Sequence, residues 1–174
     1  MNPANDNRND DAAHWEAVEE PCEVLLEGRF EEGLRMLRDV IKADPANPYA
    51  YHYVGVALYE LRQIEPARDA YRAAVRYAPS YLAARVGLSH VLRELGDARG
   101  ALNEAQEALS RFPRDGDAMR AAGLAHAALG QRKAARRQLQ GYLSSSADVE
   151  DRMEVQQILE MLGIGEDDEP LEIA

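Results

Sequence analysis

The segment PANPYAYHYVGVALYELRQIEPARDAYRAAVRYAP, residues 45–79, decides the fold of this chain of 174 residues. It begins at Pro45 and ends at Pro79, and Pro113 follows after another interval of 34 residues. A fixed interval of this length is typical of proteins built from similar stacked units. The chain therefore contains a repeat array.

The apolar spacing between two prolines predicts two helices in each unit. It is seen in Tyr51, Val54, Leu58 and Leu61, followed by Ala67, Tyr71 and Ala74. Between the two helices the chain reverses at Gly28, Gly96 or Gly130, with Arg62 at the remaining step. Each proline ends a second helix because it has no N–H to donate. Small residues are expected where the helices cross, with Gly55, Ser89 and Gly123 facing Ala67, Ala101 and Ala135.

The pattern resembles the tetratricopeptide repeat, whose signature positions match Tyr51, Val54, Gly55, Leu58, Ala67, Tyr71, Ala74 and Pro79. The resemblance implies an all-α protein, a right-handed α-solenoid of tandem helix-turn-helix repeats with a C-terminal capping helix. We expect a repeat domain at 12–163, with repeats at 14–47, 48–81, 82–115 and 116–149 and the cap helix at 148–162.

The first repeat and the end of the fourth depart from this pattern. The first has Pro21 in the glycine position and Glu20 where a leucine is expected, which predicts a kinked or divided first helix. After the fourth repeat, an apolar stripe that ends at Gly163 predicts the cap helix. Its members are Val155, Ile158, Leu159 and Leu162.

The charges are distributed unevenly along the chain, whose formal net charge is -11. Residues 33–147 carry 17 Lys and Arg against 11 Asp and Glu, and the two ends carry 3 against 20. The acidic ends either cover the mildly basic middle or only keep the chain soluble. Residues 1–11 and 164–174 are short, acidic and weakly apolar, so we expect them to be disordered.

The sequence contains no catalytic or cofactor motif. We therefore predict that the protein is not an enzyme and uses no cofactor. Its four histidines, His14, His52, His90 and His126, fall at different positions of successive repeats, so no metal site is expected. The basic cluster of Arg132, Lys133, Arg136 and Arg137 lacks neighbouring aromatic residues, which argues against nucleic-acid binding.

Three features predict a cytoplasmic protein. Cys22 is the only cysteine, the first ten residues are polar, and no stretch of about 18 apolar residues is present for membrane insertion. Lys42 and Lys133 are the only lysines among many arginines, which indicates a GC-rich, bacterial genome.

The resemblance also implies that the first helix of each repeat lines a concave groove. The candidate groove residues are Trp15, Tyr49, His52, Val56, Tyr59, Val86, His90, Arg93, Arg120 and Leu124. Tyrosine suits such a surface because it combines a large apolar area with a polar tip. Alternatively, Trp15, Tyr49 and Tyr59 serve as packing residues between repeats.

The resemblance implies a non-catalytic adaptor or scaffold that binds a peptide or partner protein. Its ligand is expected to combine an apolar anchor with an acidic residue, because the groove is aromatic at one end and carries Arg93 and Arg120 toward the other. The chain's own tail, EDDEPLEIA at 166–174, has this composition, so homo-association through groove or tail is a further hypothesis.

Two related functions of the family require other sequence features. Family members that hold the acidic C-terminus of cytosolic heat-shock chaperones use lysine and asparagine at positions that here carry Val18 and Cys22, and two basic residues where this chain has Asp117 and Ala121. This function is therefore disfavoured. The alternative function is a small acidic cytosolic bacterial secretion chaperone. That alternative expects a dimerising N-terminal helix, whereas residues 1–11 are polar.

Overall fold

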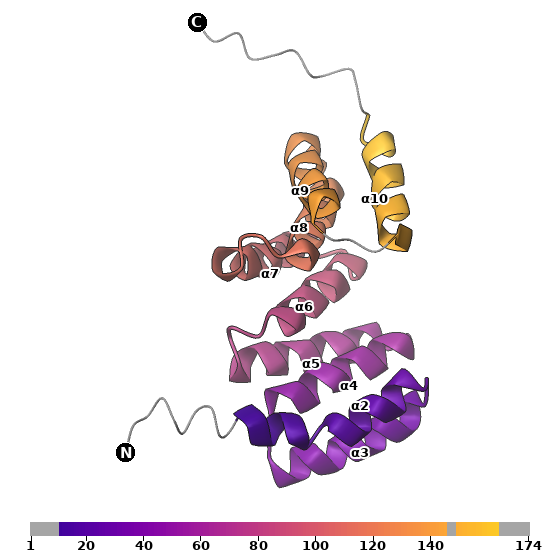
Figure 1. The fold of residues 1–174 in the computed structure, drawn as a ribbon, viewed down its shortest axis with the longest axis vertical. Coiled ribbons are helices and arrows are strands. Elements are labelled where there is room, and N and C mark those ends of the chain that lie inside the picture. Colours follow the sequence, from indigo (N-terminus) through magenta and orange to yellow (C-terminus); the bar gives the residue numbers. More distant parts are fainter. Residues whose placement is uncertain (1–10, 146–148, 164–174) are drawn as a thin grey trace, which may run out of the picture.

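The computed structural model describes residues 11–145 and 149–163, which form a right-handed α-solenoid (Figure 1). A helical segment at 11–16 precedes α2 (Glu19–Leu26), α3 (Phe30–Ala43), α4 (Pro48–Glu60), α5 (Ile64–Tyr77), α6 (Leu82–Glu94), α7 (Ala98–Arg111), α8 (Gly116–Ala128), α9 (Arg132–Ser144) and α10 (Val149–Met161). No strand occurs within the described ranges. This architecture confirms the predicted fold class.

The helices begin and end where local chemistry dictates. Asn47, Asp97 and Asp115 cap α4, α7 and α8, since each side chain accepts a hydrogen bond from a backbone N–H of the first turn at 2.8–3.1 Å. The turns within the pairs use a left-handed residue, as predicted. Gly96 has φ 82°, and Arg62 takes the same conformation with φ 59°.

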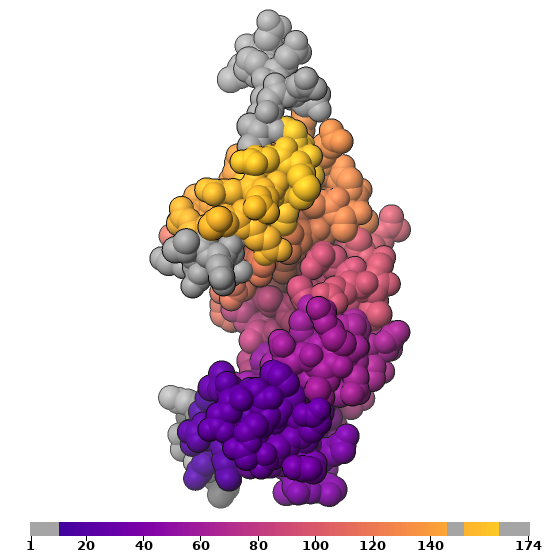
Figure 2. All heavy atoms as spheres, turned by 90° about the vertical axis from the view of Figure 1, so that its right-hand side faces the viewer, coloured from indigo at the N-terminus to yellow at the C-terminus, as the bar shows by residue number. Residues whose placement is uncertain are grey.

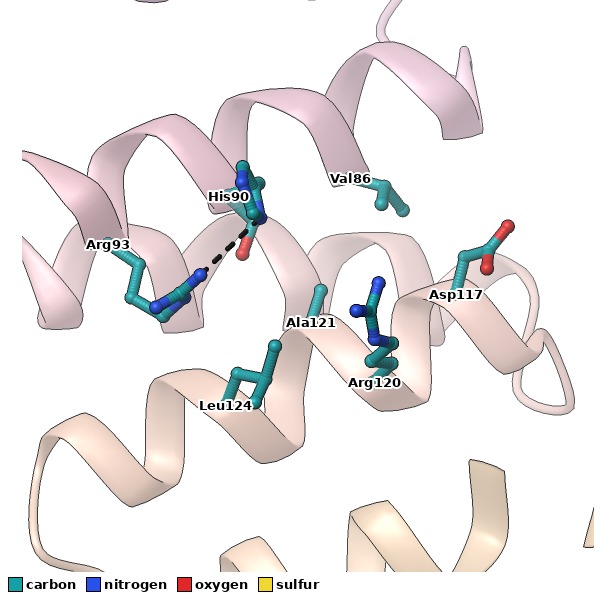
Figure 3. A pocket seen from close by; sticks show the side chains of 8 residues that line it. Val86, His90, Arg93, Asp117, Arg120, Ala121 and Leu124 are labelled. Carbon is teal, nitrogen blue, oxygen red and sulfur yellow. Dashed lines mark hydrogen bonds between the residues drawn. The ribbon is translucent and has the colours of Figure 1, made fainter. Parts of the chain in front are cut away.

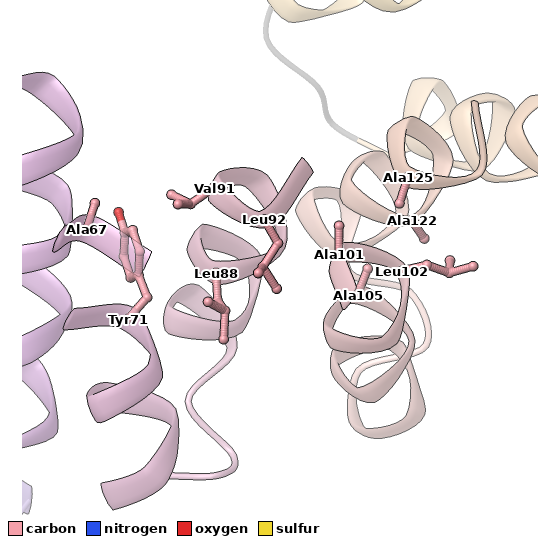
Figure 4. Packing of buried hydrophobic residues seen from close by; sticks show 10 residues of the cluster. All are labelled: Ala67, Tyr71, Leu88, Val91, Leu92, Ala101, Leu102, Ala105, Ala122 and Ala125. Atoms are coloured by element: carbon pink, nitrogen blue, oxygen red, sulfur yellow. The ribbon is translucent and has the colours of Figure 1, made fainter. Parts of the chain in front are cut away.

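The helices of a pair cross closely at small residues. A Cβ added to Gly55 would lie 2.9 Å from the Tyr71 ring, and one added to Gly87 would lie 2.6 Å from it. The Tyr71 ring therefore fills the space between α5, α4 and α6 (Figure 4). In the next pair the Ser89 hydroxyl donates to the Ala101 carbonyl at 2.8 Å, which confirms the predicted contact between these two positions.

The first helix is divided, as the sequence predicts. The chain turns at Ala17 and Val18, and Pro21 then lies in the first turn of α2, where a missing N–H costs no helical hydrogen bond. Asn47 ties the segment before the turn to the array, because its side-chain amide donates to the His14 carbonyl at 2.9 Å.

Helix α10 closes the C-terminal end of the array, and Figure 2 shows it covering one face of the preceding helices. Val155 and Leu159 are buried in one apolar cluster with Leu139 and Tyr142 of α9. The predicted apolar stripe thus packs as a cap.

Several sequence predictions fall partly or wholly outside the described part of the chain. Disorder is predicted for 1–11 and 164–174, and of these residues only Asp11 lies within the described ranges. The acidic tail at 166–174 is also outside them. Among the described helices, none is long and apolar enough to cross a bilayer.

Candidate functional site

An open hollow of about 530 Å³ lies along the inner faces of α4, α6 and α8. The floor is formed by α6, with Tyr59 of α4 on one side and Arg120 of α8 on the other. Its lining residues are Tyr59, Tyr71, Tyr81, Leu82, Ala83, Val86, Gly87, His90, Val91, Asp117 and Arg120. The hollow therefore combines aromatic and apolar walls with two opposite charges, those of Arg120 and Asp117.

A smaller hollow of about 50 Å³ continues the groove between α6 and α8 (Figure 3). It is lined by Val86, Ser89, His90, Arg93, Asp117, Arg120, Ala121 and Leu124. Val86, His90, Asp117 and Arg120 belong to both hollows, so the two form one continuous surface.

A hydrogen-bonded network connects α4 and α6 at one side of the groove. The Tyr59 hydroxyl donates to Glu94 Oε1 at 2.5 Å and lies 2.7 Å from His90 Nε2. Because the hydroxyl has one proton, Nε2 of a neutral His90 is the donor to it. His90 Nδ1 is then an acceptor, and Arg93 Nη2 lies 3.5 Å from it.

This network shifts the protonation equilibria of its members. Burial, together with the bond to Glu94, raises the pKa of Tyr59 to about 12. The hydrogen bond from Tyr59 lowers the pKa of Glu94, and burial and the charge of Arg93 lower the pKa of His90. Near neutral pH the groove thus holds an ionised Glu94 and a neutral His90.

Arg120 is already paired with a carboxylate. Its Nη2 lies 2.5 Å from Oε2 of Glu154, which belongs to the cap helix α10. The exposed fractions of the two side chains are 27% and 54%, so solvent reaches the pair. An arginine of the groove is therefore positioned to hold a carboxylate at a place that water and solutes can reach.

An aromatic cluster occupies the N-terminal end of the groove. Trp15 packs edge-on against Tyr49 with ring centroids 5.5 Å apart, and Tyr49 packs edge-on against Tyr81 at 5.0 Å. The Tyr49 hydroxyl donates to Asp11 at 2.7 Å, and burial raises its pKa to about 12. The rings of this cluster contact one another across successive helix pairs.

His52 lies against the same cluster. Its ring centroid is 5.0 Å from those of Tyr53 and Tyr81 and 5.6 Å from that of Tyr71. Burial lowers the pKa of His52 to about 4, and its Nδ1 has no hydrogen-bond partner among the residues that the structure describes.

The structure brings some of the predicted groove residues together and separates others. Six of them line the two hollows: Tyr59, Val86, His90, Arg93, Arg120 and Leu124. Trp15, Tyr49 and His52 lie in the aromatic cluster instead, and Val56 packs against the central apolar core. The role of all ten in binding stays a prediction.

Sequence reasoning did not select Tyr71, Tyr81 or Gly87 as groove residues. The repeat pattern assigns Tyr71 to the packing of one helix pair, and the structure shows that it also reaches the groove. Tyr81 precedes α6, and its aromatic character was the only signal for it in the sequence.

The described residues contain no group of three or more His, Cys, Asp or Glu side chains arranged to hold a metal ion. His52 and His90 lie in separate contacts, the first against Tyr81 and the second against Tyr59. Cys22 is a free, half-buried thiol.

Comparison with known proteins gives a family match and several structural matches. A family model described as tetratricopeptide repeat matches residues 27–81 and 86–149. A structure of MamA from residue 41 to its end, from Desulfovibrio magneticus RS-1, has a TM-score of 0.73 and 19% identity, covering 86% of this chain and 82% of that one. None of the curated proteins is a significant match to the chain.

Peptide binding is named in the descriptions of two further structures. YrrB, a protein of the same repeat type "with an unusual peptide-binding site", has a TM-score of 0.70 and 17% identity, covering 84% of this chain and 74% of that one. The first repeat domain of Spaghetti (RPAP3), bound to the HSP90 peptide SRMEEVD, has a TM-score of 0.63 and 20% identity. The match covers 67% of this chain and 92% of that one. At these identities the likeness concerns the fold alone.

Proposed function

Because the chain belongs to the tetratricopeptide repeat family, we propose that it is a non-catalytic adaptor that captures a peptide or a segment of a partner protein in its groove. One observation carries the proposal. In the hollow between Tyr59 and Arg120, apolar walls lie next to an arginine that is paired with the carboxylate of Glu154. The two peptide-binding structures of the same fold support this function.

The ligand that fits the hollow has a bulky apolar residue near an acidic one. Burial of the apolar residue contributes about 1.5 to 3 kcal/mol. A charge-assisted hydrogen bond to Arg120 contributes about 1.5 to 3 kcal/mol more, before ordering costs are subtracted. A dissociation constant on the order of micromolar is therefore expected.

The proposal includes a bacterial, cytoplasmic setting, supported by the single Cys22 and by the bias toward arginine. It also includes the acidic tail at 166–174, which has the composition of the expected ligand, as a candidate occupant of the groove in the same or a second copy. The secretion-chaperone alternative depends on residues 1–10, which are outside the described ranges.

A selection from a random peptide library against the full chain tests this function. We expect the recovered peptides to combine a large apolar residue with Asp or Glu. Arg120→Glu should lower the affinity of the chain for these peptides by about tenfold or more. Arg137→Glu is the matched control, since Arg137 is exposed on α9 and lines neither hollow. Recovered peptides without acidic residues, or equal binding to the two variants, would refute the proposal.

Glu154→Gln provides a second test, because Glu154 competes with the ligand for Arg120. Removing its charge is expected to raise the affinity for the recovered acidic peptides by a few fold, about 0.5 kcal/mol, since the exposed pair is weak. A loss of affinity would mean that Glu154 supports binding instead.

A further inference from the structure

Tyr71 lines the larger hollow, and no other tyrosine of the hollow is as deeply buried. Only 5% of this residue is exposed, and its ring lies against the backbone of α6 at Gly87. No hydrogen bond joins the hydroxyl to any of the residues that the structure describes. Its oxygen is not among the fully buried side-chain atoms that lack a hydrogen bond, so part of it is accessible to an acceptor carried by a ligand in the hollow.

Two other tyrosines of the hollow show what is unusual about Tyr71. The Tyr59 hydroxyl is satisfied by His90 and Glu94. Tyr81 also makes no side-chain hydrogen bond within the described residues, but it is only half-buried, so water reaches it more easily. Tyr71 is therefore the more shielded of the two unbonded tyrosines, so a hydrogen bond from it to a ligand competes less with water.

The Tyr71 hydroxyl is a donor in its neutral state, because burial raises its pKa. The walls around it are apolar, since Leu82, Val86 and Val91 line the same hollow. A side chain that fits this site is therefore large and apolar and has an oxygen at its far end. Among the natural amino acids, tyrosine combines an aromatic ring with such an oxygen.

We propose that the hollow is a subsite selective for a tyrosine of the bound peptide, whose hydroxyl oxygen accepts a hydrogen bond from Tyr71. This inference rests on the proposed function and specifies the anchor residue of the ligand. Arg120, on the rim of the same hollow, would then hold an acidic residue close to that tyrosine.

The test is a double-mutant cycle with two peptides and the full chain. The peptides are acetyl-Gly-Tyr-Gly-Glu-Gly-amide and its counterpart with phenylalanine, and their affinities are measured by isothermal titration calorimetry. The native chain is expected to bind the tyrosine peptide about three- to tenfold more tightly. Tyr71→Phe should remove this preference while keeping the melting temperature, because its hydroxyl makes no bond within the described residues.

Tyr81→Phe removes the other unbonded hydroxyl of the hollow, and its comparison with Tyr71→Phe shows which of the two hydroxyls supplies the preference for tyrosine. Tyr51→Phe, outside both hollows, controls for general effects.

The outcomes separate this inference from the function on which it rests. If the native chain binds both peptides equally, the tyrosine subsite is refuted, whatever the stability of the variants, and the groove function stands. If Tyr81→Phe abolishes the preference and Tyr71→Phe does not, the assigned residue is wrong. If neither peptide binds, both the subsite and the groove function are contradicted.

Discussion

Arg62 occupies a turn position that glycine occupies in the other helix pairs. Its φ of 59° lies in the left-handed region, as do the φ values of Gly28, Gly96 and Gly130. A residue with a Cβ pays about 1 kcal/mol for this conformation. We predict that Arg62→Gly raises the free energy of unfolding by about 0.5 to 1 kcal/mol, measured by urea denaturation.

The matched control is Gly96→Ala at the equivalent turn. A Cβ there would meet no atom within 4 Å, so the change tests the backbone conformation without a steric clash. It should lower the stability by a similar amount. A stabilising Gly96→Ala or a destabilising Arg62→Gly would contradict the assignment of these turns.

His52 predicts a pH dependence of stability. Burial lowers its pKa to about 4, from the value of 6.5 expected for the unfolded chain. As the pH falls below 6.5, the unfolded state binds a proton that the folded state does not, so stability is lost until the pH approaches 4. We expect a loss of about 1 kcal/mol from this residue between pH 7 and pH 5.5, measured by urea denaturation.

His52→Phe is the control, because it keeps an aromatic ring in the cluster and cannot titrate. The difference in stability between pH 7 and pH 5.5 should shrink in this variant. An undiminished difference would assign the pH dependence to another group, with His90 as the first candidate because burial also lowers its pKa.

At the scale of the helices, α10 packs on the array through an apolar stripe, and its Glu154 pairs with Arg120 of α8. Val155 is fully buried in a cluster with Leu139 and Tyr142, while Met153 on the same helix is 58% exposed. We predict that Val155→Asp detaches α10 and costs about 2 kcal/mol or more, because it places a charge in an apolar contact.

The readouts are the melting temperature and light scattering. Val155→Asp should lower the melting temperature and increase light scattering, because detachment of α10 exposes the apolar edge of α9. Met153→Asp should change neither. Equal behaviour of the two variants would show that α10 does not cap the array.

At the scale of the whole molecule, the repeat interval explains why much of the fold was predictable. A step of 34 residues places equivalent residues in equivalent environments, so the turn at Arg62 and the contact between Ser89 and Ala101 followed from the sequence. The divided first helix followed from the local chemistry of Pro21.

The groove was less predictable because its shape depends on side chains that meet across repeats. The pairs of Tyr59 with Glu94 and of Arg120 with Glu154 join residues on different helices, and side-chain conformations decide them. The apolar anchor was expected against Tyr49, Val56 and Tyr59. Of these, Tyr59 lines the larger hollow, whereas Trp15 and Tyr81 pack against the ring of Tyr49.

The most direct test of groove binding is amide chemical-shift mapping by NMR of the full chain, titrated with a peptide recovered from the library selection. The account predicts that the largest shifts cluster on the inner faces of α6 and α8, around Val86, His90 and Arg120, with little change around Lys133 and Arg137 on α9. Shifts concentrated on α9 and absent from α6 would contradict it.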